Sequence, residues 1–224
     1  MGERVSVIIP TYNEEKYLPK LLKSLAFLNP DEVIVVDGKS TDNTGQIAYS
    51  FGAKFISCER GRGLQLHRGA LEAKGNFLLF LHADTYLNER IDLSIITKKG
   101  IKAGFFNLKF EENNLSLRIL ARLINFRAKT LFLPYGDQGL FIDRDLYFQI
   151  GGYRNLPFLE DFDLIRRLKK VYLPRCLEHT LIVSGRKFQS KIPGYPFWIS
   201  IKNNFLIALF LLGVSPEFLK KLYK

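Results

Sequence analysis

The sequence has few of the residues that build disulfides or metal clusters. Its 224 residues include two cysteines, three histidines and one tryptophan, and Cys58 and Cys176 form no CxxC pair. This cysteine content excludes a disulfide-rich secreted scaffold and a thiolate-bound zinc domain. We expect both thiols to be reduced, which points to the cytoplasm.

Acidic residues are also scarce relative to basic ones. The 22 aspartates and glutamates face 33 lysines and arginines, so the formal net charge is +11. Such a balance predicts an anionic partner, which can be nucleic acid, a diphosphate compound or an acidic membrane surface. Nucleic acid is not expected as a partner, because no motif that reads DNA or RNA occurs in the chain.

Long hydrophobic runs are missing as well. The N-terminus enters a strand pattern directly without an apolar leader, so we expect no secretion. The most apolar segment, Tyr195–Val214, is interrupted by Lys202 and two asparagines, which leaves too short a run for a membrane-spanning helix. Two interpretations stay open for this segment. It packs on the domain or on a second copy as a homodimer, or it lies in an anionic membrane interface on the inner face of the cell membrane, with Trp198 at headgroup level.

Alternating strand and helix patterns fill the first hundred residues and predict an α/β fold with a mainly parallel sheet flanked by helices. We predict one domain over 1–190, followed by an apolar and basic helical segment over 191–224. The expected strands are Val5–Pro10, Val33–Val36, Ala53–Ser57, Phe77–Asp84, Ala103–Phe110 and Gly139–Ile142. The expected helices are Glu14–Leu28 with Asn13 as its cap, Asn43–Phe51, Leu64–Lys74, Leu115–Leu131, Asp145–Ile150 and Glu160–Lys170.

Polar residues follow three of these strands. Thr11 to Glu14 come after the first, Asp37 to Ser40 after the second, and Asp84 closes the buried run that starts at Phe77. Ligands of open α/β sheets bind at the carboxyl ends of strands. We therefore expect these side chains to line one edge of the sheet, where a carboxylate is suited to hold a divalent cation against a diphosphate.

Together with Glu160-Asp161, these motifs resemble glycosyltransferase family 2, the inverting enzymes of the GT-A (Rossmann-like) fold, over roughly residues 4–185. Gly61-Arg62-Gly63, His82-Ala83-Asp84-Thr85 and Tyr135-Gly136-Asp137-Gln138-Gly139 look like a bacterial subgroup named for arsenosugar biosynthesis.

The resemblance implies a nucleotide-sugar donor held at the sheet edge. Asp37 would accept from the base or the ribose, and Arg62 would supply positive charge, since Leu66-His67 stand where family members often carry an arginine–asparagine pair. The expected donor-binding residues are Pro10, Thr11, Tyr12, Asn13, Glu14, Asp37, Gly38, Ser40, Arg62, Gln65, Ala83 and Asp84.

A metal ion is implied by the same resemblance. In the family's Asp-x-Asp motif the last aspartate, here Asp84, binds Mg²⁺ or Mn²⁺ that bridges the diphosphate. This chain has His82 in place of the first aspartate, and we expect His82 to contact the ribose or to fill the strand end rather than to bind metal. His179 is a second candidate ligand, as a histidine is in some GT-A enzymes.

The resemblance also implies the catalytic base. Inverting transfer needs a carboxylate that takes the proton of the attacking hydroxyl, and the metal stabilises the leaving diphosphate in place of a general acid. Asp161 would be this base, with Glu160 orienting it or a sugar hydroxyl. Asp137 and Gln138 would contact hydroxyls of the donor or acceptor sugar.

The predicted function is a metal-dependent inverting glycosyltransferase that acts on an unknown acceptor hydroxyl, a lipid-linked one being an option. The alternatives are an inactive, basic module that binds membranes or nucleic acid on the same fold, and a nucleotidyltransferase. The Glu160-Asp161 pair argues against the nucleotidyltransferase, and intact carboxylates argue against an inactive module.

Overall fold

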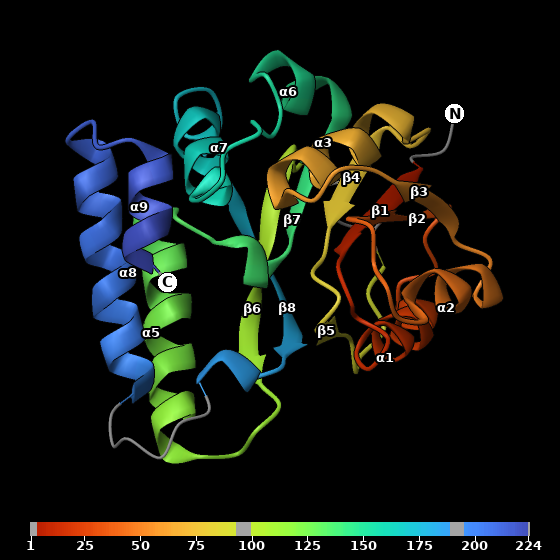
Figure 1. The fold of residues 1–224 in the computed structure, drawn as a ribbon, viewed down its shortest axis with the longest axis horizontal. Helices are drawn as coiled ribbons and strands as arrows, with labels where there is room; N and C mark the ends of the chain where they lie inside the picture. The colour runs from red at the N-terminus through yellow and green to blue at the C-terminus, as the bar shows by residue number, and fades with distance from the viewer. Residues whose placement is uncertain (1–3, 93–99, 189–194, 224) are drawn as a thin grey trace.

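The chain folds around an eight-stranded sheet with helices on both faces (Figure 1). The structure is a computed structural model that describes residues 4–92, 100–188 and 195–223. Across the sheet the strands are β3 (Lys54–Ser57), β2 (Glu32–Asp37), β1 (Val5–Thr11), β4 (Phe77–Phe80), β7 (Leu140–Asp143), β6 (Ala103–Phe110), β8 (Arg175–Val183) and β5 (Thr85–Tyr86). The first four are parallel, β6 is parallel to β8, and β7 and β5 pair antiparallel with their neighbours.

Alternation along the strands builds a separate hydrophobic layer on each face of the sheet. In β1, Val7 and Ile9 lie in one buried cluster and Ile8 in the other, because successive side chains of a strand point to opposite faces. Helices α1 (Leu18–Ser24) and α2 (Thr44–Ser50) contribute to the first cluster. Helices α3 (Arg62–Glu72), α6 (Arg144–Gln149) and α7 (Glu160–Leu168) contribute to the second.

Gly69 lets α3 lie very close to the sheet. A Cβ atom at this position would lie 2.4 Å from Cγ2 of Ile8 and 3.0 Å from Cγ2 of Val36. Any larger residue would push α3 away from β1 and β2. This close packing fixes the start of α3, and therefore Arg62, over the carboxyl ends of those strands.

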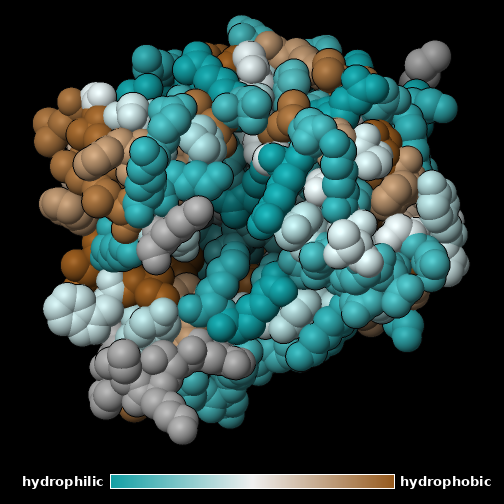
Figure 2. All heavy atoms as spheres, viewed as in Figure 1, coloured by the Kyte–Doolittle hydropathy of each residue, from teal (hydrophilic) through white to brown (hydrophobic). Residues whose placement is uncertain are grey.

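The C-terminal helices form a separate layer with α5 (Leu115–Leu131) on one side of the molecule (Figure 1). Helix α8 (Tyr195–Leu211) packs on α5 and on α9 (Pro216–Tyr223). Much of α8 stays exposed, and Figure 2 shows hydrophobic residues gathered on this side of the molecule. No helix among the described residues combines the length and the apolar character needed to cross a bilayer.

Two predicted elements are shorter in the structure than expected. The helix predicted over Glu14–Leu28 begins only at Leu18, and Asn13 does not cap it. Asn13 instead has a left-handed backbone (φ 53°), and its side chain accepts a hydrogen bond from the Thr41 amide. The strand predicted to end at Asp84 ends at Phe80, because the chain turns at His82, where the Thr85 amide donates to the carbonyl.

Two strands of the described residues, β5 and β8, were not predicted, whereas α9 lies within the helical segment predicted over 191–224. The pattern of β8 is hard to recognise because it is interrupted by Glu178, which has a left-handed backbone (φ 62°), and by a register shift against β6. The strand β5 has only two residues. Strand β8 is important for the site, since the residues that follow it return to Asp84.

Candidate active site

The loops after β1 and β2 are held together as one unit. Asp37, at the end of β2, accepts hydrogen bonds from the Thr11 hydroxyl (2.9 Å) and from the Ser40 amide (2.7 Å) and hydroxyl. The Asn13 amide donates to the Ser40 hydroxyl (2.8 Å). The structure therefore brings together the first two loops that the sequence places at the sheet edge.

Gln65 braces these loops from below. Its side chain is almost fully buried, and its amide nitrogen donates to the carbonyls of Thr11 and Val36, both at 2.8 Å. The Gly61 amide donates to its oxygen at 3.3 Å. The polar atoms of Gln65 are thus engaged with the main chain, and the side chain supports the loops rather than projecting from them. A Cβ atom on Gly38 would lie 3.3 Å from the Gln65 side chain, so the glycine leaves space for Gln65 to reach these carbonyls.

An aromatic and cationic pair stands at the outer end of the loops. The Arg60 guanidinium lies 3.6 Å from the centre of the Tyr12 ring. Tyr12 is 36% exposed, so a ring and a cation face solvent beside Asp37 and Gly38. Tyr12 was a predicted donor-binding residue, whereas sequence reasoning overlooked Arg60.

Asp84 lies at the edge of the sheet, as predicted, but it is paired with a residue from the far end of the chain. Arg186, in the short helix η3 (Arg186–Phe188) after β8, donates through Nε to Asp84 Oδ2 at 2.9 Å. Its two terminal nitrogens donate to the Glu14 carboxylate at 3.1 and 2.8 Å. Burial opposes the charge of Arg186, but the hydrogen bond to Glu14 and the charge of Asp84 raise its pKa above the ordinary value.

Asp137 collects a second set of partners. His82 Nδ1 lies 3.0 Å from Asp137 Oδ1, and Lys187 Nζ lies 3.9 Å from the same oxygen. Burial opposes the charge of Asp137, but Lys187 and the hydrogen bond from His82 hold its pKa well below the usual range. His82, which stands in place of the first aspartate of the Asp-x-Asp motif, therefore contacts a carboxylate of the protein.

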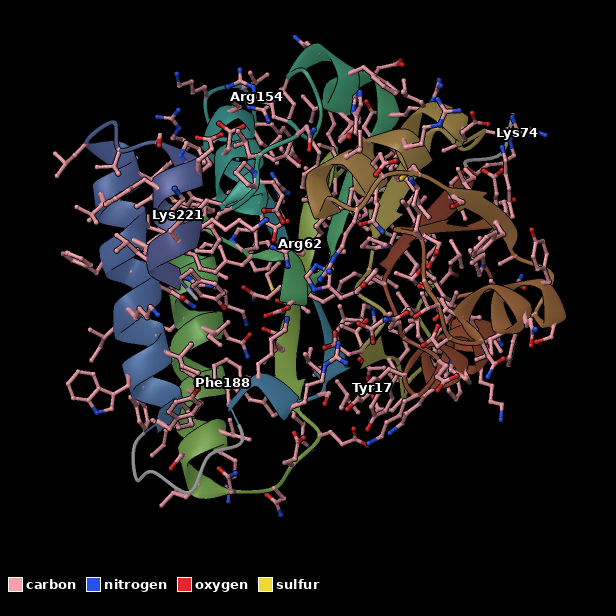
Figure 3. The ribbon with its side chains drawn as sticks, in the orientation of Figure 1. Tyr17, Arg62, Lys74, Arg154, Phe188 and Lys221 are labelled. Atoms are coloured by element: carbon pink, nitrogen blue, oxygen red, sulfur yellow. The ribbon has the colours of Figure 1, made fainter. Side chains whose placement is uncertain are left out.

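The predicted base lies at the start of α7 and is paired with Arg62 (Figure 3). Arg62 forms an ion pair with Glu160 through Nε and with Asp161 through Nη2, the latter at 3.0 Å. The pKa of Arg62 is raised by the charges of Asp161 and Glu160, although burial opposes its charge. Among the described residues, Asp161 Oδ1 is buried without a hydrogen-bond partner. One oxygen of the predicted base is thus held by Arg62, and the other has no hydrogen-bond partner among the described residues.

A glycine allows the η2 helix (Gly136–Gln138) to approach this base. A Cβ atom on Gly136 would lie 2.6 Å from Asp161 Oδ2 and 2.6 Å from His82 Nε2. Any side chain at position 136 would push the η2 helix away from Asp161 and His82. Gly136 is therefore needed for the packing that places Asp137 and Asp161 around one space.

That space is a pocket of about 170 Å³ between the sheet edge and the C-terminal helices. Its charged side chains are Arg62, Asp137, Asp161 and Lys187. Its apolar wall comes from the segment before α7 and from α7, η3, α8 and α9: Phe158, Leu159, Phe162, Phe188, Ile199, Ile207 and Tyr223. Figure 2 shows a hollow at the middle of the molecule, with hydrophilic residues around it. The C-terminal helices therefore form a wall of the pocket that contains the predicted base.

Three predicted site residues, Arg62, Asp137 and Asp161, line this pocket, whereas others, including Gln138 and His179, do not. Gln138 is fully buried, donates to the Phe106 carbonyl at 3.3 Å, and lines a neighbouring cavity of about 70 Å³. His179 lies 3.3 Å from Glu89, four residues along β8 from Val183, the partner of Thr85. With about 3.3 Å per residue of strand, His179 lies on the order of 13 Å from the Asp84 end of β8. The structure does not bring His179 to Asp84.

The carboxylates at the sheet edge fit a divalent metal that is shared with a phosphate ligand. Asp84 and Glu14 are both reached by one guanidinium, so their oxygens surround the place of a single cationic group. Carboxylate oxygens suit Mg²⁺ and Mn²⁺. No group of three or more acidic, histidine or cysteine residues that could hold a metal occurs within 4–92, 100–188 and 195–223. The residues therefore suit a cation whose coordination is completed by the ligand.

Comparison with known proteins identifies the family of this chain. Residues 6–99 match the model of glycosyl transferase family 2. The PGL/p-HBAD biosynthesis glycosyltransferase of Mycobacterium bovis is 32% identical over 203 residues, which cover 82% of this chain and 77% of that protein. The chain belongs to glycosyltransferase family 2. The resemblance seen in its sequence motifs is thereby confirmed at the level of the family, and the arsenosugar subgroup stays a prediction.

Other glycosyltransferases share only part of their length with this chain. The poly(ribitol-phosphate) beta-N-acetylglucosaminyltransferase TarS of Staphylococcus aureus is 32% identical over 171 residues, which cover 65% of this chain and 29% of TarS. The solved structure of the mannosyltransferase PcManGT of Pyrobaculum calidifontis, in complex with GDP-Man and Mn²⁺, superposes on this chain with a TM-score of 0.66 at 18% sequence identity. The superposed part covers 92% of this chain and 63% of the PcManGT chain. The fold of this chain is therefore the expected GT-A fold.

Besides Arg60, sequence reasoning missed two basic residues of this candidate site, Arg186 and Lys187. Both follow β8, which was not recognised as a strand. The available signal was the Ser184-Gly185-Arg186-Lys187 stretch, a polar turn with two cations placed directly after an apolar run. The family model ends before these residues, and also before Asp137, Glu160 and Asp161.

Proposed function

We propose that this chain transfers a sugar from a nucleoside-diphosphate donor to an acceptor hydroxyl with inversion at the sugar carbon. The observation that carries the proposal is the position of Asp161. Asp161 lines a pocket whose other charged side chains are Arg62, Asp137 and Lys187, and its buried Oδ1 has no hydrogen-bond partner among the described residues. Family membership supports the reaction class, and the loops at Asp37 and Asp84 supply the donor side.

The donor's nucleoside is assigned to the loops after β1 and β2. Tyr12 and Arg60 offer a stacking surface, and the main chain near Gly38 offers hydrogen-bonding groups. Asp37 already accepts three hydrogen bonds from Thr11 and Ser40, so it holds the loop in shape and has one oxygen with room for a further donor. This supports a nucleotide, and both uridine and guanosine remain candidates for its base.

Asp84 and Glu14 are assigned to Mg²⁺ or Mn²⁺ beside the donor's diphosphate. When bound, the ion would neutralise the charge that develops on the leaving diphosphate. The oxygen ligands present suit such an ion only together with phosphate oxygens. His179 is left out of this proposal because of its distance along β8.

Asp161 is assigned as the base. Its carboxylate takes the proton of the acceptor hydroxyl as the hydroxyl oxygen forms a bond to the sugar carbon, and the bond to the nucleoside diphosphate breaks. Arg62 holds Asp161 Oδ2 and Glu160, which fixes the direction of the free oxygen. Asp137, kept ionised by Lys187 and His82, is placed to accept hydrogen bonds from sugar hydroxyls.

The acceptor is assigned to the pocket between α7 and the C-terminal helices. Its apolar wall suits an acceptor with a hydrophobic part, and α8 continues this wall to the surface. On α8, Trp198, Ile201 and Phe205 are 60% exposed or more, and Lys202 lies exposed among them. We assign this surface to an anionic membrane, where apolar burial and attraction of each basic residue add up. A homodimer through α8 is the alternative outcome of the test given below.

The experiment that tests the proposal is a measurement of nucleoside-diphosphate release. The full chain is incubated with Mn²⁺ and a panel of UDP- and GDP-sugars, with and without candidate acceptors that carry an apolar group. Release of nucleoside diphosphate from one of these donors supports a glycosyltransferase if an acceptor increases it. If no donor gives release and neither UDP nor GDP raises the melting temperature, the alternative of an inactive module on the same fold is favoured.

A further inference from the structure

Arg186 is tied to the donor site more tightly than its position in the chain suggests. It follows β8 directly, and the Ser184 amide donates to the Asp84 carbonyl at 3.0 Å, which fixes the start of this turn against Asp84. The Arg186 guanidinium lies 4.2 Å from the centre of the Tyr17 ring. Tyr17 and Phe188, labelled in Figure 3, mark the two sides of this segment.

Three hydrogen bonds join Arg186 to the two carboxylates proposed to hold the metal. One goes to Asp84 Oδ2, and one goes to each oxygen of Glu14. The side chains of Asp84 and Glu14 are only 3% and 16% exposed, so neither carboxylate has much access to water. Removing the cation that pairs with such groups is costly, because it leaves buried charge uncompensated.

A metal ion that arrives alone must therefore displace Arg186 from Asp84 and Glu14. The displaced guanidinium would lose three charge-assisted hydrogen bonds and gain only water. A metal that arrives with a nucleoside diphosphate brings phosphate oxygens, which a guanidinium binds in a bidentate manner. The hydrogen bonds that Arg186 loses to Asp84 and Glu14 are then replaced by hydrogen bonds to phosphate oxygens.

We propose that Arg186 is a built-in competitor of the metal, which holds Asp84 and Glu14 in the empty protein and transfers to the diphosphate when metal and nucleotide bind together. The inference rests on the proposed function, because it takes Asp84 as a metal ligand. It predicts that the empty protein binds free metal weakly and that nucleotide and metal strengthen each other's binding.

Lys187 provides a matched control. It is the next residue of the same short helix and carries the same charge, but its ammonium group lies near Asp137 and forms no described hydrogen bond or ion pair with Asp84 or Glu14. The charges of Asp137 and, less strongly, of Asp84 raise the pKa of Lys187. A substitution of Lys187 therefore removes one positive charge from the site without releasing the metal carboxylates.

The test is a titration of Mn²⁺ against the full chain, with free Mn²⁺ followed by electron paramagnetic resonance. Without nucleotide, Arg186→Gln is expected to bind Mn²⁺ about 5- to 150-fold more tightly than the wild type, the usual range of coupling between two competing interactions. Lys187→Gln removes a nearby positive charge but no hydrogen bond to Asp84 or Glu14, so it is expected to tighten Mn²⁺ binding far less than Arg186→Gln does. Arg186→Lys, which cannot bridge both carboxylates, is expected to lie between, and it keeps the test available if Arg186→Gln fails to fold.

Adding UDP or GDP separates the possible failures. The inference is overturned if the wild type binds Mn²⁺ with a nucleotide but Arg186→Gln and Arg186→Lys bind free Mn²⁺ no more tightly than the wild type does. If the wild type fails to bind Mn²⁺ with either nucleotide, the assignment of Asp84 to the donor site is itself wrong, and the inference falls with it.

Discussion

Arg62 Nη2 lies 3.0 Å from Asp161 Oδ2, and this contact joins the first residue of α3 to the first turn of α7. Sequence reasoning assigned Arg62 to the nucleotide-sugar donor and Asp161 to the base. The structure shows them as partners, with Glu160 as the second carboxylate on the same guanidinium. Arg62 therefore links the start of α3 to the residue proposed as the base.

Replacing Arg62 tests this coupling. Arg62→Gln leaves Glu160 and Asp161 without their cation. It should lower the free energy of unfolding by less than the ~3–5 kcal/mol of a fully buried pair, because the Arg62 side chain is 41% exposed. We expect kcat to fall about tenfold or more, because the base loses its orientation, with little change in the Kd of the nucleoside diphosphate. Urea unfolding and calorimetric titration measure the two quantities. A large loss of nucleotide affinity with unchanged kcat would instead favour a direct contact of Arg62 with the donor.

Asp84 is tested through the metal dependence of nucleotide binding. Asp84→Ala should weaken nucleoside-diphosphate binding far more in Mn²⁺ than in EDTA, because it removes the proposed protein anchor of the bridging ion. Thermal shift with UDP or GDP under both conditions measures the difference. Equal losses in the two buffers would leave Asp84 as only the structural partner of Arg186.

Asp137 gives a prediction for pH. Its pKa is depressed in the folded protein, since Lys187 and His82 favour the ionised form against the cost of burial. The ionised Asp137 carboxylate therefore stabilises the folded protein at any pH above the pKa of an unfolded aspartate, which is about 4. This stabilisation is lost progressively as the pH falls from about 4 towards the lower pKa of the folded state. The wild type should therefore lose more melting temperature between pH 6 and pH 3 than Asp137→Asn does. Parallel curves for the two proteins would show that Asp137 contributes no such term.

The exposed face of α8 gives a prediction for membranes. Truncation is a poor test, because Ile199, Ile207 and Tyr223 also line the pocket. Instead, Trp198→Ser with Phe205→Ser should abolish sedimentation with phosphatidylglycerol vesicles at low salt, since both side chains are at least 60% exposed.

Tyr49→Ser is the matched control for the membrane test, because Tyr49 is 65% exposed on α2, away from α8. It should sediment as the wild type does. A wild type that stays in solution, but changes from dimer to monomer when Trp198 and Phe205 are replaced, would assign this face to a second copy.

The parts of the site that follow strands with clear patterns were predictable from the sequence. Asp37 follows a strand of four consecutive β-branched residues, and Glu160-Asp161 begins a helix whose first turn favours acids. The family motifs added the roles. Local pattern was sufficient here because each of these residues is placed by its own element.

The rest depends on contacts between distant segments, which local pattern does not encode. Arg186 reaches Asp84 only because β8 pairs with β6 and β5, and β8 is disguised by the bulge at Glu178. Gln65 was predicted to contact the donor, but its position on α3 turns it toward the carbonyls of Thr11 and Val36. The residue type of Gln65 fits either role, and only the packing of α3 decides between them.

The most direct test of the account is the turnover of Asp161→Asn. The substitution preserves size and removes the ability to accept a proton, so release of nucleoside diphosphate in the presence of the true acceptor should fall about 10²–10⁴-fold. Nucleotide binding in Mn²⁺ should be nearly unchanged. Turnover close to that of the wild type would contradict the assignment of Asp161 as the base.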